Sequence, residues 1–196
     1  MSASKERVEL CVQPGFLLLL GILFYLSDGN GIVLMAVIAA VVHEGGHIVA
    51  CKLMRGRVER LTLSMVGAEL KLDYPVVLSY GRENLVLLTG SIANLLIGAI
   101  LFLLGAYQIT CIMVALGIFN LLPVAPLDGG RVMFNVLSQH FGPAWATRGT
   151  LVVSAVVAGI LGGIGVVWAV RFANIIPLIL SAWILLGLMR EKTIFS

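Results

Sequence analysis

Two histidines and a glutamate stand close together in the run His43-Glu44-Gly45-Gly46-His47. Histidines at positions i and i+4 of a helix lie on one face, about one turn apart. Both imidazoles can then bind one zinc ion, whose nitrogen ligands lie at about 2.0–2.1 Å. Glu44 projects beside such a metal, which suits a general base that takes a proton from water. The pattern therefore predicts one hydrolytic zinc ion per chain.

The composition of the chain places this motif in a membrane. Of the 196 residues, 60% are hydrophobic and 12% are charged, whereas soluble proteins average about 45–50% apolar and about 25% charged. A single soluble core of this size cannot hide the excess apolar surface. Ionisable groups inside a membrane are costly and functional by default, so an accidental HExxH in an apolar helix is disfavoured.

Several further features of the sequence exclude other classes of protein. The cysteines Cys11, Cys51 and Cys111 are scattered and form no CxxC pair, which argues against a disulfide framework or a cysteine zinc site. The net charge of +3, with no basic patch interleaved with aromatics, does not suggest nucleic acid binding. Glu6 and Glu9 interrupt the charged N-terminal region, so we expect a first membrane segment and no cleaved signal peptide.

Six apolar segments approach the length of about 20 residues that a spanning helix needs. They predict an all-α polytopic membrane protein with about six transmembrane helices, in a single domain over residues 1–196. The fourth segment, about 109–137, is broken by prolines and by Gly129-Gly130. A break at membrane depth is tolerated where it lines a cavity or is buried in protein, so it indicates a site. The segments are Val12–Leu26, Gly31–Leu53, Asn84–Tyr107, Ile109–Leu122 continuing irregularly to about Leu137, Leu151–Val170 and Ala173–Leu188.

The basic residues predict the orientation of these segments. With six spans both termini lie on one side, and that side receives all of the 13 lysines and arginines except Arg171. Basic residues concentrate in cytoplasmic loops. We therefore expect a multi-pass protein with both termini in the cytoplasm.

A hydrolytic zinc site needs a third protein ligand and one open position. Asp128 is the candidate, because it lies at the break in the fourth segment, where prolines and glycines free the backbone from the helix. The second and fourth segments run in the same direction and carry these residues late, toward the cytoplasmic face. Alternatively, Asp128 caps a helix that begins near Gly129. For His140, the remaining histidine, an ordinary interfacial position is the simpler interpretation.

Outside the apolar segments, polar and apolar residues alternate on both sides of Gly67. A period of two predicts strands, and the glycine between them predicts a hairpin over about 60–73. The hairpin is expected to lie against the membrane face and to offer a free edge to an extended peptide. The alternative is a plain amphipathic connector. Candidate substrate-binding residues on this edge are Glu69, Leu70, Lys71 and Leu72.

These motifs resemble those of the site-2 proteases, intramembrane zinc metalloproteases with HExxH on one span and LDG on another. His43–His47 matches the first motif and Leu127-Asp128-Gly129 matches the second. Asn120 stands in the expected lead-in to the second motif and is a candidate substrate contact. The resemblance implies that Asp128 is the third zinc ligand and that the glutamate of HExxH activates water.

A third element of this family, of the type GPxxN, resembles Gly90-Ser91-Ile92-Ala93-Asn94. Ser91 stands where the family has proline. Asn94 is a candidate substrate-binding residue, with helix packing as the alternative.

The similarity is to the short form of the family, without a PDZ domain, and to the stage IV sporulation FB protease branch. Val12-Gln13-Pro14 and the run from Asn120 to Gly130 carry this similarity. It implies a bacterial membrane, cleavage of a membrane-associated sigma-factor precursor, and inhibitory membrane protein partners. Many such proteins carry a C-terminal CBS domain, which the given sequence lacks, so either regulation by nucleotide is not expected or a C-terminal domain has been removed.

Two other classes of protein share some of these features. A zinc-binding membrane protein without protease activity would keep the metal ligands and show no turnover. A transporter would also combine broken helices with ionisable groups at membrane depth. Peptide cleavage that depends on Glu44 distinguishes a protease from both.

Overall fold

The computed structural model describes residues 8–27, 29, 31–64 and 67–195. The chain divides into two compact units, the first of residues 1–78 and 89–117 and the second of residues 79–88 and 118–196. The division runs through one continuous helix, α3 (Tyr80–Leu103). The single domain expected over residues 1–196 stays a prediction.

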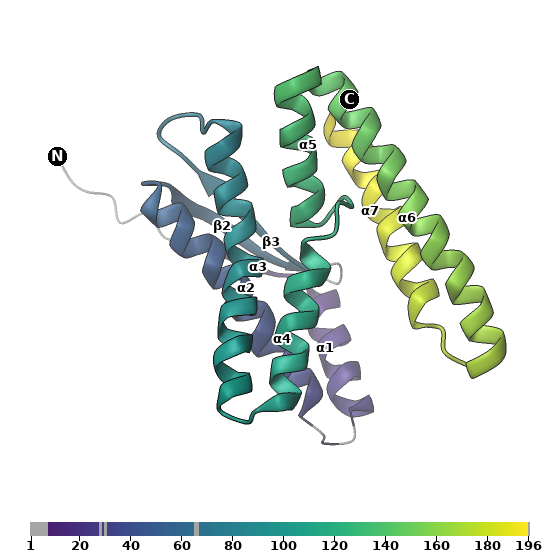
Figure 1. Cartoon of the computed structure of the whole chain (residues 1–196). Helices are drawn as coiled ribbons and strands as arrows, with labels where there is room; N and C mark the ends of the chain where they lie inside the picture. The colour runs from purple at the N-terminus through teal and green to yellow at the C-terminus, as the bar shows by residue number, and fades with distance from the viewer. Residues whose placement is uncertain (1–7, 28, 30, 65–66, 196) are drawn as a thin grey trace. The chain divides into compact units, whose positions relative to one another are not determined.

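The first unit combines helices with a small sheet. Pro14 occupies the first turn of α1, where its fixed φ suits a helix and its missing N–H costs nothing. Gly31, with a φ of 69° in the left-handed region, precedes α2, and glycine adopts that conformation without strain. The elements, shown in Figure 1, are β1 (Glu9–Val12), α1 (Pro14–Leu26), α2 (Ile32–Leu53), β2 (Arg57–Ser64), β3 (Gly67–Asp73), most of α3, and α4 (Tyr107–Asn120) up to residue 117.

The sheet has the strand order β1-β2-β3. The antiparallel pair β2-β3 confirms the predicted hairpin, with Leu61 opposite Leu70 and Thr62 opposite Glu69; residues 65–66 of the expected turn lie outside the described residues. A ribbon of two strands was the wrong expectation, because β1 pairs with β2 in parallel. Three strands are also the more stable arrangement, since an isolated hairpin is marginal in water.

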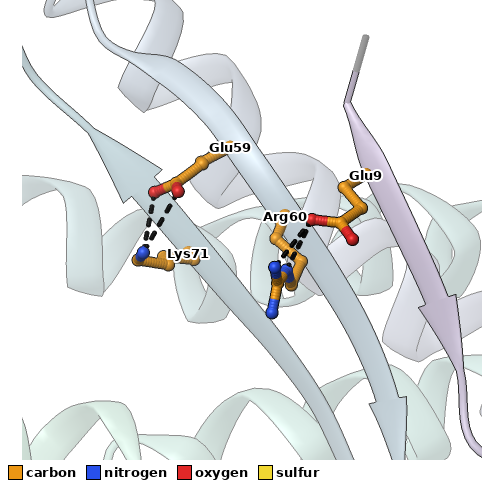
Figure 2. A network of polar contacts seen from close by, with 4 residues as sticks. All are labelled: Glu9, Glu59, Arg60 and Lys71. Carbon is orange, nitrogen blue, oxygen red and sulfur yellow. Dashed lines mark hydrogen bonds and ion pairs between the residues drawn. The ribbon is translucent and has the colours of Figure 1, made fainter.

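Exposed ion pairs connect the three strands, as Figure 2 shows. Arg60 of β2 lies opposite Glu9 of β1, and its Nη2 atom is 2.7 Å from the Glu9 carboxylate. Lys71 of β3 reaches Glu59 of β2 at 3.0 Å. Such exposed pairs contribute only about 0–1 kcal/mol each. They support the strand register more than the stability of the fold.

The second unit contains the first turns of α3 and three further helices, α5 (Asp128–Phe141), α6 (Pro143–Phe172) and α7 (Ile176–Phe195). Helices α6 and α7 lie side by side, joined by a short turn at Ala173, which has a φ of 51° (Figure 1). The core of this unit is formed by the segment before α5 and by residues of α6 and α7. Its buried members are Val124, Ala125, Leu127, Ala158, Ile184 and Leu188.

Among the described residues, three helices, α2, α3 and α6, are long and apolar enough to cross a membrane, and three shorter apolar helices cover 14–25, 107–120 and 176–188. The predicted fourth span is two helices in the structure. Helix α4 ends at Asn120, a loop covers 121–127, and α5 begins at Asp128. Helix α5 is markedly less apolar than its neighbours, since it carries polar residues such as Arg131 and Asn135.

Candidate active site

Helix α2 places the two histidines of HExxH side by side. The Nε2 atoms of His43 and His47 are 3.2 Å apart, and their rings meet edge to face with centroids 4.8 Å apart. Both side chains are buried, with 6% and 7% of their surface exposed. Their spacing of four residues along one helix produces this convergence, as the sequence predicted.

The distance between these nitrogens fits a shared metal ion. Two nitrogen ligands at about 2.0–2.1 Å from a tetrahedral ion are about 3.3–3.4 Å apart, close to the 3.2 Å observed here. Imidazole nitrogens are among the preferred zinc ligands. Glu44 directly follows His43 on the same helix and is half-buried, so its direction differs from that of His43 by about 100° around the helix axis.

Helix α3 passes directly over the two imidazoles at Gly90. A Cβ on Gly90 would contact the Nε2 atom of His47 and would lie 2.9 Å from the Cε1 atom of His43. The opposing position on α2 is Gly46, where a Cβ would lie 2.6 Å from the carbonyl oxygen of Thr89. Small residues at such crossings let membrane helices approach closely. The two glycines therefore bring the backbone of α3 against the histidines.

Two buried polar side chains follow Gly90 on α3. Ser91 and Asn94 each have 0% of their surface exposed. Within the part of the chain that the structure describes, the Ser91 hydroxyl and both polar atoms of the Asn94 amide have no hydrogen-bond partner. Asn94 lies four residues after Gly90 and so shares its helix face. Because buried polar groups are normally satisfied, this amide is available to a ligand.

In the second unit, Asp128 is the first residue of α5 and is half-buried. Leu127 is the N-cap, and no side chain makes a capping hydrogen bond there. Asp128 therefore lies one residue inside the helix and not at the N-cap position. A carboxylate in the first helical turn is nevertheless favoured by the helix dipole.

The glycines that follow Asp128 pack directly on the loop 121–127. A Cβ on Gly130 would lie 2.5 Å from the backbone nitrogen of Ala125, and one on Gly129 would contact the carbonyl oxygen of Leu121. Only residues without a Cβ permit this approach. The motif LDGG thus folds the loop tightly onto the start of α5.

The other residues singled out in the sequence lie on α4, β3 and α5. Asn120 is the last residue of α4 and is half-buried. On β3, Leu70 and Leu72 are half-buried whereas Glu69 and Lys71 are exposed, which is the predicted alternation. His140 is exposed in the last turn of α5, about 18 Å along the helix axis from Asp128 at about 1.5 Å per residue.

Sequence reasoning missed Ser154 of α6. Its hydroxyl oxygen accepts a hydrogen bond of 2.9 Å from the backbone N–H of Ala125, in the loop that precedes Asp128. A signal was present, because a hydroxyl within an otherwise apolar span needs a partner.

The sequence profile of Peptidase family M50 matches residues 106–163, a range that includes Asp128 and Ser154. The solved structure of the site-2 protease from Methanocaldococcus jannaschii matches 97% of this chain and 93% of that chain, with a TM-score of 0.71 and 22% identity. The chain has the site-2 protease fold.

Two further proteins are similar to this chain in sequence. A zinc metalloprotease of Methanocaldococcus jannaschii is 24% identical over 197 residues, which is 91% of this chain and 56% of that protein. Stage IV sporulation protein FB of Bacillus subtilis is 24% identical over 187 residues, which is 91% of this chain and 62% of that protein. The chain thus spans somewhat more than half the length of these relatives. The resemblance expected from the motifs is confirmed.

Proposed function

We propose that the chain is a zinc endopeptidase of the site-2 protease type, which hydrolyses a peptide bond in or near the membrane. The observation that carries this proposal is the 3.2 Å spacing of the Nε2 atoms of His43 and His47 on an apolar helix long enough to cross a membrane. The similarity to a zinc metalloprotease supports zinc as the metal.

We propose His43, His47 and Asp128 as the zinc ligands. Both histidines are buried and the aspartate is half-buried. Two imidazoles and one carboxylate are a typical donor set for catalytic zinc and leave one coordination position open. Bound there, zinc would supply Lewis-acid chemistry and lower the pKa of water toward about 7.

Glu44 is proposed as the general base. It takes a proton from the attacking water, whose oxygen forms the new bond to the scissile carbonyl carbon. When the carbon–nitrogen bond breaks, Glu44 passes this proton to the leaving amine nitrogen. Glu44 directly follows His43 on α2 and is half-buried, which supports this role.

Three regions are proposed to hold the substrate backbone. The unsatisfied amide of Asn94 can exchange hydrogen bonds with a peptide group, and Asn120 is a second candidate. Strand β3 ends the order β1-β2-β3, so its outer edge, with Glu69–Leu72, can accept an extended segment as a further strand. A helical substrate must unwind first, because helical carbonyls are already hydrogen-bonded.

The membrane topology and the substrate are further parts of the proposal. Three long and three shorter apolar helices support six spans. With six spans, Arg171 is separated from all the other basic residues, which supports both termini in the cytoplasm and an active site toward that side. Similarity to a sporulation protein supports a membrane-associated sigma-factor precursor as substrate, with inhibitory membrane proteins as partners.

Zinc content and cleavage, measured together on the purified full chain, test this proposal. The variants are His47→Ala and, as a matched control, His140→Ala, which removes an exposed histidine at the far end of α5. We expect about one zinc per chain and cleavage of a membrane-tethered sigma-factor precursor in the wild type and the control, and loss of both in His47→Ala. A wild type without zinc, or a His47→Ala protein that keeps both properties, would overturn the proposal.

A further inference from the structure

The loop 121–127 is part of the hydrophobic core of the second unit. Val124, Ala125 and Leu127 have 0%, 2% and 4% of their surface exposed, and they pack with residues of α6 and α7. Gly187 of α7 also lies close to the loop, since a Cβ there would be 2.8 Å from the Cδ atom of Pro126. Buried backbone groups need hydrogen-bond partners, so each N–H group of this loop needs an acceptor.

The loop has five N–H groups outside proline, and four of them bind main-chain carbonyls nearby. These donors belong to Leu121, Leu122, Val124 and Leu127, with acceptors between Ile118 and Val124. The fifth donor, Ala125, instead binds the Ser154 hydroxyl at 2.9 Å. Ser154 therefore supplies a long-range hydrogen bond from α6 to this backbone.

The Ser154 hydroxyl is fixed in its orientation. It donates to the carbonyl oxygen of Thr150, one turn earlier on α6, at 2.7 Å, and Ser154 has 0% of its surface exposed. Since the hydroxyl hydrogen is used on Thr150, a lone pair is left to accept the Ala125 N–H. Rotation of the hydroxyl hydrogen away from the Thr150 carbonyl would lose that bond and turn the lone pair away from the Ala125 N–H.

The loop also connects Ala125 tightly to the start of α5. The N–H of Leu127 binds the carbonyl of Val124 at 2.8 Å, and the N–H of Gly130 binds the carbonyl of Leu127 at 3.0 Å. Asp128 lies within this bonded segment and is three residues from Ala125. A displacement at Ala125 is therefore passed to the Asp128 backbone.

We propose that Ser154 is a positioning residue for Asp128, acting through the hydrogen bond that its hydroxyl accepts from the Ala125 N–H. This inference rests on the proposed function in one respect, namely that Asp128 is a metal ligand. Residues that orient metal ligands from outside the coordination shell typically change metal affinity when mutated. Loss of the Ser154 hydroxyl leaves a buried N–H without a partner, and the loop then shifts to satisfy it.

Ser181 offers a matched control on the same pair of helices. Its hydroxyl, 7% exposed, donates to the carbonyl oxygen of Ala158 at 2.8 Å and so joins α7 to α6. Ser181→Ala removes one buried serine hydrogen bond to a main-chain carbonyl, at a residue outside the loop, and leaves no main-chain N–H without an acceptor. Ser154→Thr is the conservative variant, because threonine in a helix can still bond the carbonyl four residues earlier.

The test uses the purified full chain in lipid nanodiscs. Amide hydrogen exchange is measured over the loop 121–127, and zinc affinity is measured by competition with a chelator. For Ser154→Ala we expect faster loop exchange and zinc affinity weakened about tenfold, the lower end of the range for residues that orient metal ligands. Ser181→Ala is expected to leave both unchanged, and Ser154→Thr to restore them.

Unchanged loop exchange and zinc affinity in Ser154→Ala would overturn the inference, as would an equal loss of affinity in Ser181→Ala. If Ser154→Thr does not fold, the comparison of the two alanine variants decides alone. If the wild type binds no zinc, the proposed function fails, and loop exchange still shows whether Ser154 anchors the loop: faster exchange in Ser154→Ala supports the anchor and unchanged exchange overturns it.

Discussion

Gly46 of α2 and Gly90 of α3 face one another at a helix crossing so close that a Cβ on Gly46 would lie 2.9 Å from the Cα atom of Gly90. The crossing lies one residue before His47, and Gly90 in turn packs on the imidazoles. Helix packing and the geometry of the histidines therefore depend on the same two positions.

Gly46→Ala should disturb both the fold and the metal site. The added methyl group would contact the backbone of α3, which cannot yield as a flexible side chain can. We expect a loss of about 1–3 kcal/mol in the free energy of unfolding, as for other overpacked sites, and a lower zinc content. Thermal unfolding and metal analysis of the purified chain measure the two effects.

Gly45→Ala is the matched control for this prediction. A Cβ on Gly45 would have nothing within 4 Å, and alanine favours a helix over glycine by up to about 1 kcal/mol. The variant should keep its zinc and be at least as stable as the wild type. Equal behaviour of the two variants would refute the role assigned to the helix crossing.

Asn94→Ala should lower activity without lowering stability. The Asn94 amide is buried with no hydrogen-bond partner among the described residues, so its removal relieves an unfavourable burial. If the amide binds the substrate backbone, kcat/KM should fall about tenfold, the equivalent of one hydrogen bond of about 1.4 kcal/mol. Steady-state kinetics and thermal unfolding separate the two effects.

Asn135→Ala is a useful contrast for Asn94→Ala. Asn135 is also buried, but its amide donates to the side-chain oxygen of Asn84 at 3.0 Å. Its loss should therefore cost stability, by about 1 kcal/mol. An Asn94→Ala protein that is destabilised as much as Asn135→Ala and cleaves normally would assign Asn94 to helix packing.

The outer edge of β3 predicts a difference between neighbouring proline substitutions. Along an antiparallel strand, successive N–H groups point alternately to the partner strand and to the opposite edge. Of Leu70→Pro and Lys71→Pro, one should therefore remove a bond to β2 and destabilise the sheet. The other should remove a donor from the outer edge, lowering cleavage while thermal stability and zinc content stay unchanged.

Reporter cleavage, zinc analysis and unfolding of both proline variants check this prediction. Deletion of Glu69–Leu72 is a coarser test, in which cleavage should fall more than zinc content. Cleavage and zinc lost in equal proportion, or cleavage unaffected in both proline variants, would exclude β3 as the acceptor of substrate.

Features that depend on local periodicity could be predicted from the sequence. The convergence of His43 and His47 follows from a spacing of four residues on one helix, and the β2-β3 hairpin follows from a period of two around Gly67. Asn94 was singled out by its place in a motif, but its unsatisfied amide is visible only in the structure.

Features that depend on distant contacts could not be predicted in this way. Strand β1 has four residues, too few for a periodic signal, and forms only by pairing with β2 far along the chain. The bond from Ala125 to Ser154 joins positions 29 residues apart. The fourth apolar segment was predicted as one broken span, because apolar residues continue through the loop that separates α4 from α5.

The central claim is that Glu44 is the general base beside a zinc ion, and Glu44→Gln tests it most directly. Glutamine keeps the size of the side chain but cannot take a proton. Zinc content and cleavage of a membrane-tethered substrate are measured for wild type and variant. We expect about one zinc per chain in both and at least about a hundredfold loss of cleavage in Glu44→Gln. A wild type without zinc, or a variant that cleaves as fast as the wild type, would contradict the mechanism.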